Sequence, residues 1–397
     1  MNTHCLNLKG NNRMKYIWLL ISFLCFSCSS KQMKEQESAS CIRVNLADYL
    51  EGEKDDEVAL SELVDSLAYI PLQTPDDLPM DVLMSVKMSS EYIFVLDRRQ
   101  VLYRFDKQGR FLNLIGNRGG GPEEYVSAVD FEVDEKNRAV CLFDIYRKKI
   151  KFYQMSGAFM EDMVVPEGVE SIALLNDSSF IGYKPWHATT DKSEQCVIFG
   201  KSAQVYETVT FGLDENVRRI KIDLFRMPDF NRVSDASRFR MPFEPSIYMI
   251  SDSFKITKEI EFEMGSHLLP LEVSMNNELY NRSLNSSYVF ELQASGKAGL
   301  IFMSFFYQKK HYRVIYDIVA EKFYTVFVGR EPEGIMNDLD GGASFWPMWY
   351  SSDKMIGVIT PDALEMEYAD SSIKELYDEF SEYDNPVLQI VYVRQRR

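Results

Sequence analysis

The sequence predicts an all-β fold: six four-stranded antiparallel blades arranged in a ring, the six-bladed β-propeller. Two stretches that repeat one pattern 47 to 48 residues apart carry this prediction. Tyr92–Asp97 is echoed by Ala139–Asp144, and the hairpin glycine Gly109 is echoed by Gly157. A period of about 40–50 residues built from short strands is typical of propeller blades. The chain has 397 residues and 46% apolar content, which is ample for one large core.

The individual strands follow from runs of β-branched and aromatic residues separated by turn residues. The first full blade is expected at residues 82–115, and residues 126–165 repeat its scheme. Further sets of strands are expected at residues 171–211, 246–262, 288–328 and 349–393. One strand at residues 68–72 precedes the first full blade, and another, Val387–Val393, lies at the far end of the chain. We expect these two strands to share one blade, because an open ring would leave two unpaired sheet edges.

Spacing alone leaves six or seven blades open. Seven blades of about 48 residues would use all of the roughly 335 residues after the N-terminal region, whereas six leave about 46 for insertions. Residues 213–245 resemble one insertion, because they are irregular and rich in Arg, Asp and Pro. Residues 372–375 form a capping box that predicts one short helix near the C-terminus, ended by Asn385-Pro386. Six blades with two insertions is therefore the better account.

The N-terminal region predicts export. A short apolar run follows Lys15 and is too short to span a bilayer, so residues 1–27 are interpreted as a signal peptide whose true start is Met14. Residues 24–28 resemble a bacterial lipobox, in which Cys28 becomes the lipidated first residue of the mature protein. An ordinary secretory signal with an incidental cysteine is the alternative. The expected location is the cell envelope, favouring the outer membrane, on its periplasmic face or at the cell surface.

The segment between the signal and the propeller is mostly polar and acidic. We therefore expect residues 28–62 to form a lipidated cysteine and a flexible tether, with residues 63–397 as a single propeller domain. Lipid at Cys28 would anchor the protein without spanning the membrane.

The charge of the chain restricts its partners. The net charge is −16, and removal of residues 1–27 takes away three basic residues and no acid. Such a chain repels phosphates, which argues against a nucleic-acid partner. Cys141 and Cys196 lie in apolar runs and are expected to be small buried side chains. No CxxC spacing occurs, so neither a zinc knuckle nor a thioredoxin-like centre is indicated.

Several motifs together resemble a known family. Residues 92–97, 104–111 and 119–124 resemble the NHL-like repeat, with its strand, aspartate turn, hairpin and Gly-rich loop. Residues 65–72, 337–347 and 385–388 resemble the "DSL.yIPL", "DGG" and "NPVL" motifs of the six-bladed β-propeller lipoproteins of Bacteroidetes. The resemblance covers about residues 64–395 and implies six blades and an envelope location. That family is largely without assigned biochemistry, so the resemblance implies no reaction.

Two aromatic clusters are candidates for ligand binding. They comprise Tyr183, Trp186 and His187, and then Trp346, Trp349 and Tyr350. Trp and Tyr side chains beside polar groups suit stacking on sugars or other flat ligands. Aromatic packing between blades is the alternative interpretation of each cluster.

Three other motifs have both a functional and a structural interpretation. Asp338 and Asp340 show the alternating carboxylates of calcium loops, although an ordinary Asp/Gly turn has the same pattern. The stretch 119–121 suits either an anion cradle or a tight crossover between blades. Ser66 lies in a sequence that resembles the O-glycosylation acceptor of Bacteroidetes, or it simply begins a strand.

A propeller scaffold serves many functions, and no GxSxG, HExxH or paired-cysteine motif marks a catalytic site. The catalytic residues, if any, are unknown at this point, and no cofactor besides calcium is indicated. We expect a ligand-binding or protein-interaction module whose partner is an envelope protein, a small molecule or a glycan bound at one mouth of the channel. The alternatives are a metal-assisted lactonase, hydrolase or lyase acting on a carbohydrate-derived substrate, and a structural subunit of an outer-membrane assembly.

Overall fold

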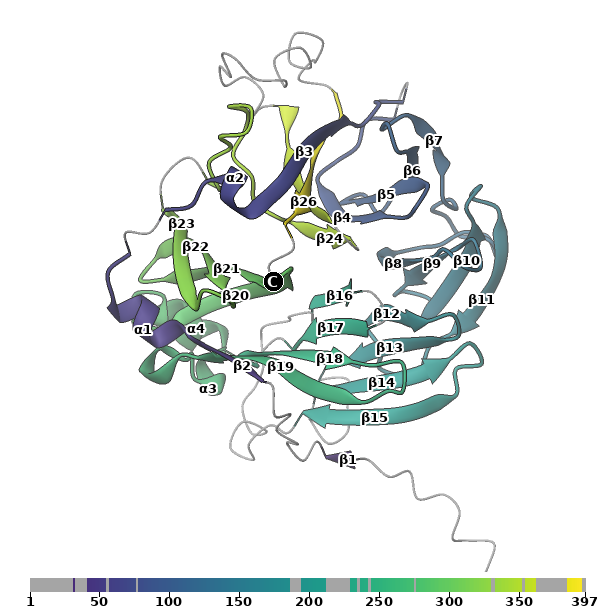
Figure 1. The fold of residues 1–397 in the computed structure, drawn as a ribbon. Coiled ribbons are helices and arrows are strands. Elements are labelled where there is room, and N and C mark those ends of the chain that lie inside the picture. Colours follow the sequence, from purple (N-terminus) through teal and green to yellow (C-terminus); the bar gives the residue numbers. More distant parts are fainter. Residues whose placement is uncertain are drawn as a thin grey trace, which may run out of the picture.

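The computed structural model shows six separate sheets arranged around a central axis (Figure 1). It describes residues 31–32, 41–54, 57–75, 78–185, 194–211, 229–233, 236–241, 244–274, 276–329, 333–351, 354–361 and 384–394. Each sheet contains an antiparallel set of four strands, and the first strand of each set lies nearest the axis (Figure 1). The predicted six-bladed β-propeller is confirmed.

The strands of the first three blades lie close to their predicted positions. Blade one comprises β4 (Leu83–Met88), β5 (Tyr92–Asp97), β6 (Leu102–Asp106) and β7 (Phe111–Leu114). Blade two comprises β8 (Ala128–Asp134), β9 (Ala139–Asp144), β10 (Lys149–Gln154) and β11 (Phe159–Val164). Blade three comprises β12 (Ser171–Asn176), β13 (Ser179–Lys184), β14 (Glu194–Gly200) and β15 (Val205–Phe211), and β1 (Lys31–Gln32) pairs in parallel with β15.

The last three blades complete the ring. Blade four comprises β16 (Asp229–Val233), β17 (Ala236–Arg240), β18 (Ser246–Ile250) and β19 (Ile256–Glu263). Blade five comprises β20 (Val289–Lys297), β21 (Leu300–Tyr307), β22 (Lys310–Asp317) and β23 (Lys322–Val328). Blade six comprises β24 (Trp349–Ser351), β25 (Lys354–Ile359), β26 (Val387–Val393) and β3 (Val64–Pro71).

The two ends of the propeller domain meet in blade six, as predicted. The C-terminal strand β26 pairs antiparallel with β3, so that Val387 lies opposite Pro71 and Val391 lies opposite Leu67. Because β25 pairs with the other side of β26, the C-terminal strand is hydrogen-bonded on both sides. This pairing joins the first and last blades without leaving an open ring.

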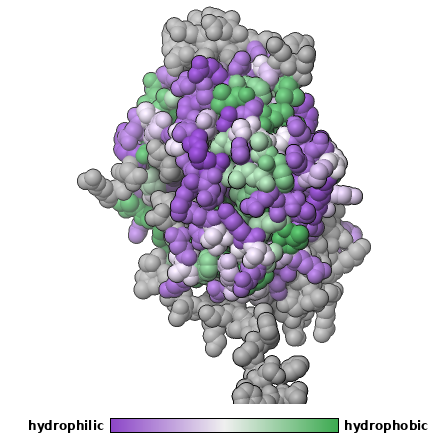
Figure 2. Space-filling view, turned by 90° about the vertical axis from the view of Figure 1, so that its right-hand side faces the viewer, coloured by the Kyte–Doolittle hydropathy of each residue, from purple (hydrophilic) through white to green (hydrophobic). Residues whose placement is uncertain are grey.

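Burial explains why the strands differ in composition. The central strand β9 is buried along its whole length, because both faces of a blade pack against neighbouring blades. The outer strand β11 is partly polar, and its Met160 and Val164 are 47% and 56% exposed. Figure 2 looks onto the side of the ring near these outer strands, where hydrophilic residues cover much of the surface and hydrophobic residues gather in patches.

The repeated aspartates stabilise the blades. Asp97 ends β5, is fully buried and accepts hydrogen bonds from the main-chain N–H groups of Asp81 and Val101, at 3.1 and 2.9 Å. Asp144 does the same at the end of β9, where it accepts from Val126 N at 2.8 Å. Each carboxylate therefore holds the loop that leads into the inner strand of its own blade.

The predicted tether differs from the structure. Residues 42–63, here called the N-terminal belt, form β2 (Ile42–Asn45), α1 (Leu46–Glu51) and α2 (Leu60–Leu63) along the outside of blades four to six (Figure 1). β2 pairs in parallel with β19, while Leu46 of α1 and Leu60 of α2 are fully buried. The folded part of the chain thus begins about 20 residues before the predicted boundary at 63, because the apolar residues of this segment pack against the ring.

The first predicted insertion also needs correction. Residues 213–245 include β16 and β17, the two inner strands of blade four, which pair antiparallel with each other. Beyond blade four, η3 (Gly265–His267), α3 (Leu271–Ser274) and α4 (Asn277–Ser283) connect to blade five. The predicted C-terminal helix at residues 372–380 lies outside the described residues, as does Cys28. Within the described part of the chain, no helix is long and apolar enough to cross a membrane.

Candidate functional site

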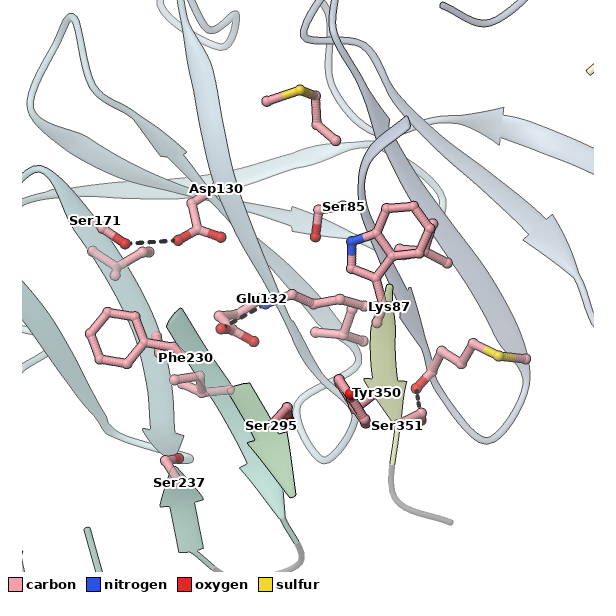
Figure 3. Close-up of a pocket in the computed structure, with 18 of the residues that line it drawn as sticks. Ser85, Lys87, Asp130, Glu132, Ser171, Phe230, Ser237, Ser295, Tyr350 and Ser351 are labelled. Carbon is pink, nitrogen blue, oxygen red and sulfur yellow. Dashed lines mark hydrogen bonds and ion pairs between the residues drawn. The ribbon is translucent and has the colours of Figure 1, made fainter. Parts of the chain in front are cut away.

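The inner strands of the six blades enclose a central cavity of about 790 Å³. Residues from β4, β8, β12, β20 and β24 line it, together with Phe230 of β16 and Ser237 of β17 (Figure 3). A cavity of this size falls in the usual range for small-molecule sites, and the channel of a closed β fold is a favoured position for one.

One wall of the cavity carries an ion pair between blades one and two. Lys87 of β4 and Glu132 of β8 approach to 2.8 Å between Nζ and Oε1, and their side chains are 28% and 14% exposed (Figure 3). Burial lowers the pKa of Lys87, but the carboxylates of Glu132 and Asp130 outweigh that effect, so the pKa is raised above its ordinary value. The ammonium group is therefore charged at neutral pH, and the pair fixes the two inner strands at this level.

Asp130 lies beside this pair and has a perturbed acidity. Removal from bulk water raises the pKa of Asp130 to about 6. The next largest effect, the attraction of Lys87, opposes this rise, and the smaller repulsion of Glu132 adds to it. Its Oδ2 accepts a hydrogen bond from Ser171 Oγ of blade three at 3.3 Å (Figure 3). A carboxyl group with this pKa can donate a proton or accept one near neutral pH, which makes it sensitive to a bound ligand.

The described residues that line the cavity are acidic in balance. Two lysines, Lys87 and Lys136, accompany six acids, namely Asp130, Glu132, Asp134, Glu135, Glu170 and Asp177. The field of such a channel favours neutral or cationic molecules over anions.

The second predicted aromatic cluster lines this cavity. Trp346, Trp349 and Tyr350 come from blade six and the segment before it. Figure 3 shows Tyr350 and Phe230 on either side of the Glu132 carboxylate in this view. Trp346 packs edge-on against Phe302 at 5.9 Å between ring centroids, which fixes its orientation. The cavity therefore combines hydrogen-bonding charged groups with aromatic faces.

Tyr183, the described member of the first aromatic cluster, does not line this cavity. Tyr183 is only 1% exposed and packs in the core between blades three and four. Its position is therefore that of a core residue, because β13 is a central strand covered on both faces. Trp186 and His187 lie outside the described residues.

The two aspartates of the predicted calcium loop have separate structural contacts. Asp338 accepts hydrogen bonds from N and Oγ of Ser61 at 2.9 and 2.6 Å and so attaches the N-terminal belt to the ring. Asp340 Oδ1 accepts from Asn337 Nδ2 at 2.6 Å and from the hydroxyl of Tyr69 at 3.2 Å. Among the described residues, no group of three or more His, Cys, Asp or Glu side chains could hold a metal ion.

The Gly-rich stretch 119–121 uses its own hydrogen-bonding groups. Gly119 N donates to Tyr125 O, and Gly121 N donates to the carboxylate of Glu124, at 2.8 and 2.7 Å. The guanidinium of Arg147 binds the carbonyl oxygens of Gly120, Gly121 and Glu124. These contacts favour the crossover interpretation, because two of the N–H groups that a cradle would need are already occupied.

Ser66, the predicted glycosylation residue, is exposed on β3, the outermost strand of blade six. Its hydroxyl lies on the outside of the ring and takes no part in the cavity.

Lys87, Asp130 and Glu132 were missed from the sequence, because their related positions become visible only in the strand pairing. Relative to the aspartate that ends the second strand, Lys87 and Glu132 occupy the same register: Lys87 lies opposite Phe94 and Glu132 lies opposite Cys141. An alignment of the sequence on Asp97 and Asp144 places Lys87 opposite Asp134 instead of Glu132, so the shared register follows from the strand pairing alone.

The ring of six blades around a ligand-sized channel defines the class of protein, the six-bladed β-propellers. Within it, the chain belongs to the family described as a domain of unknown function, DUF4934, whose model matches residues 41–392. The start of this match at residue 41 agrees with the start of the N-terminal belt. None of the curated proteins matches this sequence.

Among solved structures, a predicted exported protein from Bacteroides fragilis is similar with a TM-score of 0.70 and 18% identity, over 89% of this chain and 100% of that one. A member of the DUF4221 family from Bacteroides vulgatus reaches a TM-score of 0.47 at 8% identity, over 86% and 99%. An inactive virginiamycin B lyase from Staphylococcus aureus reaches 0.39 at 10% identity, over 68% and 78%. The first similarity supports the fold.

Proposed function

We propose that this protein is an exported, lipid-anchored propeller that binds a small organic ligand in its central channel. The observation that carries the proposal is the composition of one cavity, in which Trp346, Trp349 and Tyr350 share the lining with Asp130 and Glu132. Aromatic faces stack on flat or apolar ligand surfaces, while carboxylates accept hydrogen bonds from hydroxyl or ammonium groups.

The charge of the cavity narrows the ligand class. Six acids and two lysines line it, so an anionic ligand would be repelled. Neutral sugars and organic cations both fit this balance, since a cation is also attracted by the face of a Trp or Tyr ring.

A thermal-shift panel tests this function. Neutral oligosaccharides and organic cations at millimolar concentration should raise the melting temperature, whereas organic anions of similar size should not. Trp349→Ala should abolish the response, and Tyr146→Ala, at a 76% exposed position in the hairpin between β9 and β10, should leave it intact. If neither of the first two classes gives a response, the alternative role as a structural subunit of an envelope assembly gains support.

The export and anchoring part of the proposal rests on the N-terminal sequence and is supported by the envelope lipoproteins that the chain resembles. Cys28→Ala should release the protein from the membrane fraction, because no diacylglyceryl group can then be attached to it. A membrane-bound Cys28→Ala protein would contradict the anchor but not the binding function.

A further inference from the structure

A hydroxyl and an imidazole form a close pair in the wall of the cavity on blade five. Ser304 of β21 lines the cavity, and its Oγ lies 2.7 Å from Nε2 of His311 on β22. In the ladder, Ser304 lies opposite Arg313 and His311 lies opposite Phe306, so the pair is diagonal on one face of the blade. Both side chains are partly exposed, which leaves the hydroxyl accessible from the cavity.

Aromatic packing holds the imidazole in this position. The ring of His311 stacks on Phe306 with centroids 5.0 Å apart and planes inclined by 24°. Phe327 meets the same ring nearly edge-on at 5.5 Å. These two contacts orient Nε2 toward Ser304. In many serine–histidine pairs, a third group that hydrogen-bonds to the imidazole orients it in the same way.

The imidazole is in the form that can accept a proton. Burial and the positive charge of Arg313 lower the pKa of His311 below its ordinary value of 6.5, against a smaller opposing effect of Glu333. His311 is therefore neutral at pH 7. In its Nδ1-protonated tautomer it presents a lone pair at Nε2 to the Ser304 hydroxyl.

We propose that Ser304 and His311 are a nucleophile–base pair that cleaves small carboxylic esters entering the central channel. This activity goes beyond the binding function proposed above. The acidic balance of the lining selects neutral or cationic esters, because an anionic acyl group or alcohol would be repelled.

The chemistry needs only water as a second reactant. Ser304 Oγ attacks the ester carbon and gives its proton to His311 Nε2, and the tetrahedral intermediate then collapses. The bond from carbon to the leaving oxygen breaks, and the alcohol takes the proton from His311. Water then attacks the acyl-serine with the same imidazole as base, which releases the carboxylic acid and restores Ser304.

Labelling with diisopropyl fluorophosphate tests the pair without knowledge of the natural ester. The full-length protein should gain one phosphoryl group on Ser304, as the Oγ–P bond forms and the P–F bond breaks, located by peptide mass spectrometry. Ser304→Ala should remove this adduct, and His311→Asn should slow its formation about 100-fold, the lower range for a general base.

Ser351 provides a matched control in the same cavity. Its hydroxyl donates to the main-chain oxygen of Met88 at 3.4 Å instead of to a base. Ser351 should stay unlabelled, and Ser351→Ala should label at Ser304 like the unchanged protein. Equal adduct on both serines, or none on Ser304, would overturn the proposal.

A pH series on the unchanged protein avoids any effect of substitution on folding. The rate of adduct formation should be constant above pH 7 and fall as the pH drops through the pKa of His311, whose charged neighbours are Arg313 and Glu333. A rate that stays constant down to the pH at which the protein unfolds would reject His311 as the base. A thermal-shift response to ligands with no adduct on Ser304 would retain the binding function and reject the ester chemistry.

Discussion

At the scale of single residues, the polar groups of the channel differ in what they can contribute. Lys87 and Glu132 neutralise each other at 2.8 Å, so their pair mainly positions two inner strands. Asp130 lies beside this pair, and its removal from bulk water raises its pKa to about 6 against the smaller opposing effect of Lys87. It is the carboxyl group in this wall whose charge a ligand can alter most easily.

Asp130 should make the stability of the protein depend on pH. Its pKa is about 6 in the folded protein and ordinarily 3.8, so the folded state loses stability relative to the unfolded state as the pH rises from about 4 to about 6. Asp130→Asn lacks this loss and should be more stable than the unchanged protein at pH 7, by at most about 3 kcal/mol, with little difference at pH 4. Urea unfolding at both pH values measures the effect, and an advantage independent of pH would contradict it.

Gly157 occupies a turn of the repeat in which the backbone conformation and the neighbouring blade favour glycine. Its φ is +88°, and a Cβ atom there would lie 2.3 Å from the main-chain oxygen of Leu114 in the preceding blade. We expect Gly157→Ala to lower the free energy of unfolding by about 1–3 kcal/mol or more. Gly120→Ala is the matched control, since nothing lies within 4 Å of a Cβ there, and it should change the stability by less than about 0.5 kcal/mol.

The sequence predicts these residues unevenly for a physical reason. Asp97 and Gly109 recur as Asp144 and Gly157 because blades one and two contain the same turns, so the repeat reveals them. Ser304 and His311 come together only through strand pairing across one blade, and nothing in their separation along the chain marks a site. Trp346 and Tyr350 were predicted because aromatic density is visible locally, whereas Tyr183 has the same local signal and lies in the core.

At the scale of elements, the N-terminal belt replaces the expected tether. Tyr49 of α1 donates to or accepts from Thr325 of blade five at 2.9 Å, and its ring packs on Phe323 at 4.9 Å. Leu63 of α2 packs with residues of blades five and six. The belt therefore covers the junctions between the last three blades. The acidic composition of the segment concealed a short amphipathic pattern of Val44, Leu46, Tyr49 and Leu50.

Leu46 provides a direct test of the belt. Its side chain is fully buried in a core shared with blades four and five, so Leu46→Ala should lower the free energy of unfolding by about 2–5 kcal/mol. Glu53→Ala, at an exposed position just after α1, should change it by less than about 0.5 kcal/mol. Denaturant unfolding compares the two. If Leu46→Ala behaves like Glu53→Ala, the segment is a tether after all.

Blade four shows the limit of strand prediction. β16 and β17 contain Asp229, Asn231, Arg232, Arg238 and Arg240, a composition that is typical of loops. Inner strands face the solvent of the channel on one side, so they can carry polar residues and still belong to the sheet. The central strands are buried on both faces, so they consist mostly of apolar residues and were easy to recognise from the sequence.

At the scale of the whole molecule, one strand holds the ring closed. β26 lies between β25 and β3, and its Val387, Leu388, Ile390 and Val391 are at most 1% exposed. The pairing of Val391 with Leu67 joins residues more than 300 positions apart, so it forms only when both ends of the domain meet. The sequence allowed this closure to be predicted because both terminal segments read as strands without a partner nearby in the chain.

Removal of β26 should therefore open the ring. A chain that stops after Pro386 loses seven paired residues and exposes the edges of β25 and β3, which are templates for pairing with other molecules. We expect this variant to aggregate in size-exclusion chromatography and to lose its cooperative melting transition. A chain that stops after Arg394 keeps β26 and the hydrogen bond from Arg394 N to Leu63 O, and it should melt like the unchanged protein.

A synthetic peptide of residues 387–394, added to the shorter chain during refolding, should restore monomers by occupying the vacant strand position. A shorter chain that stays monomeric and melts normally without the peptide would show that the other five blades and the N-terminal belt maintain the ring on their own.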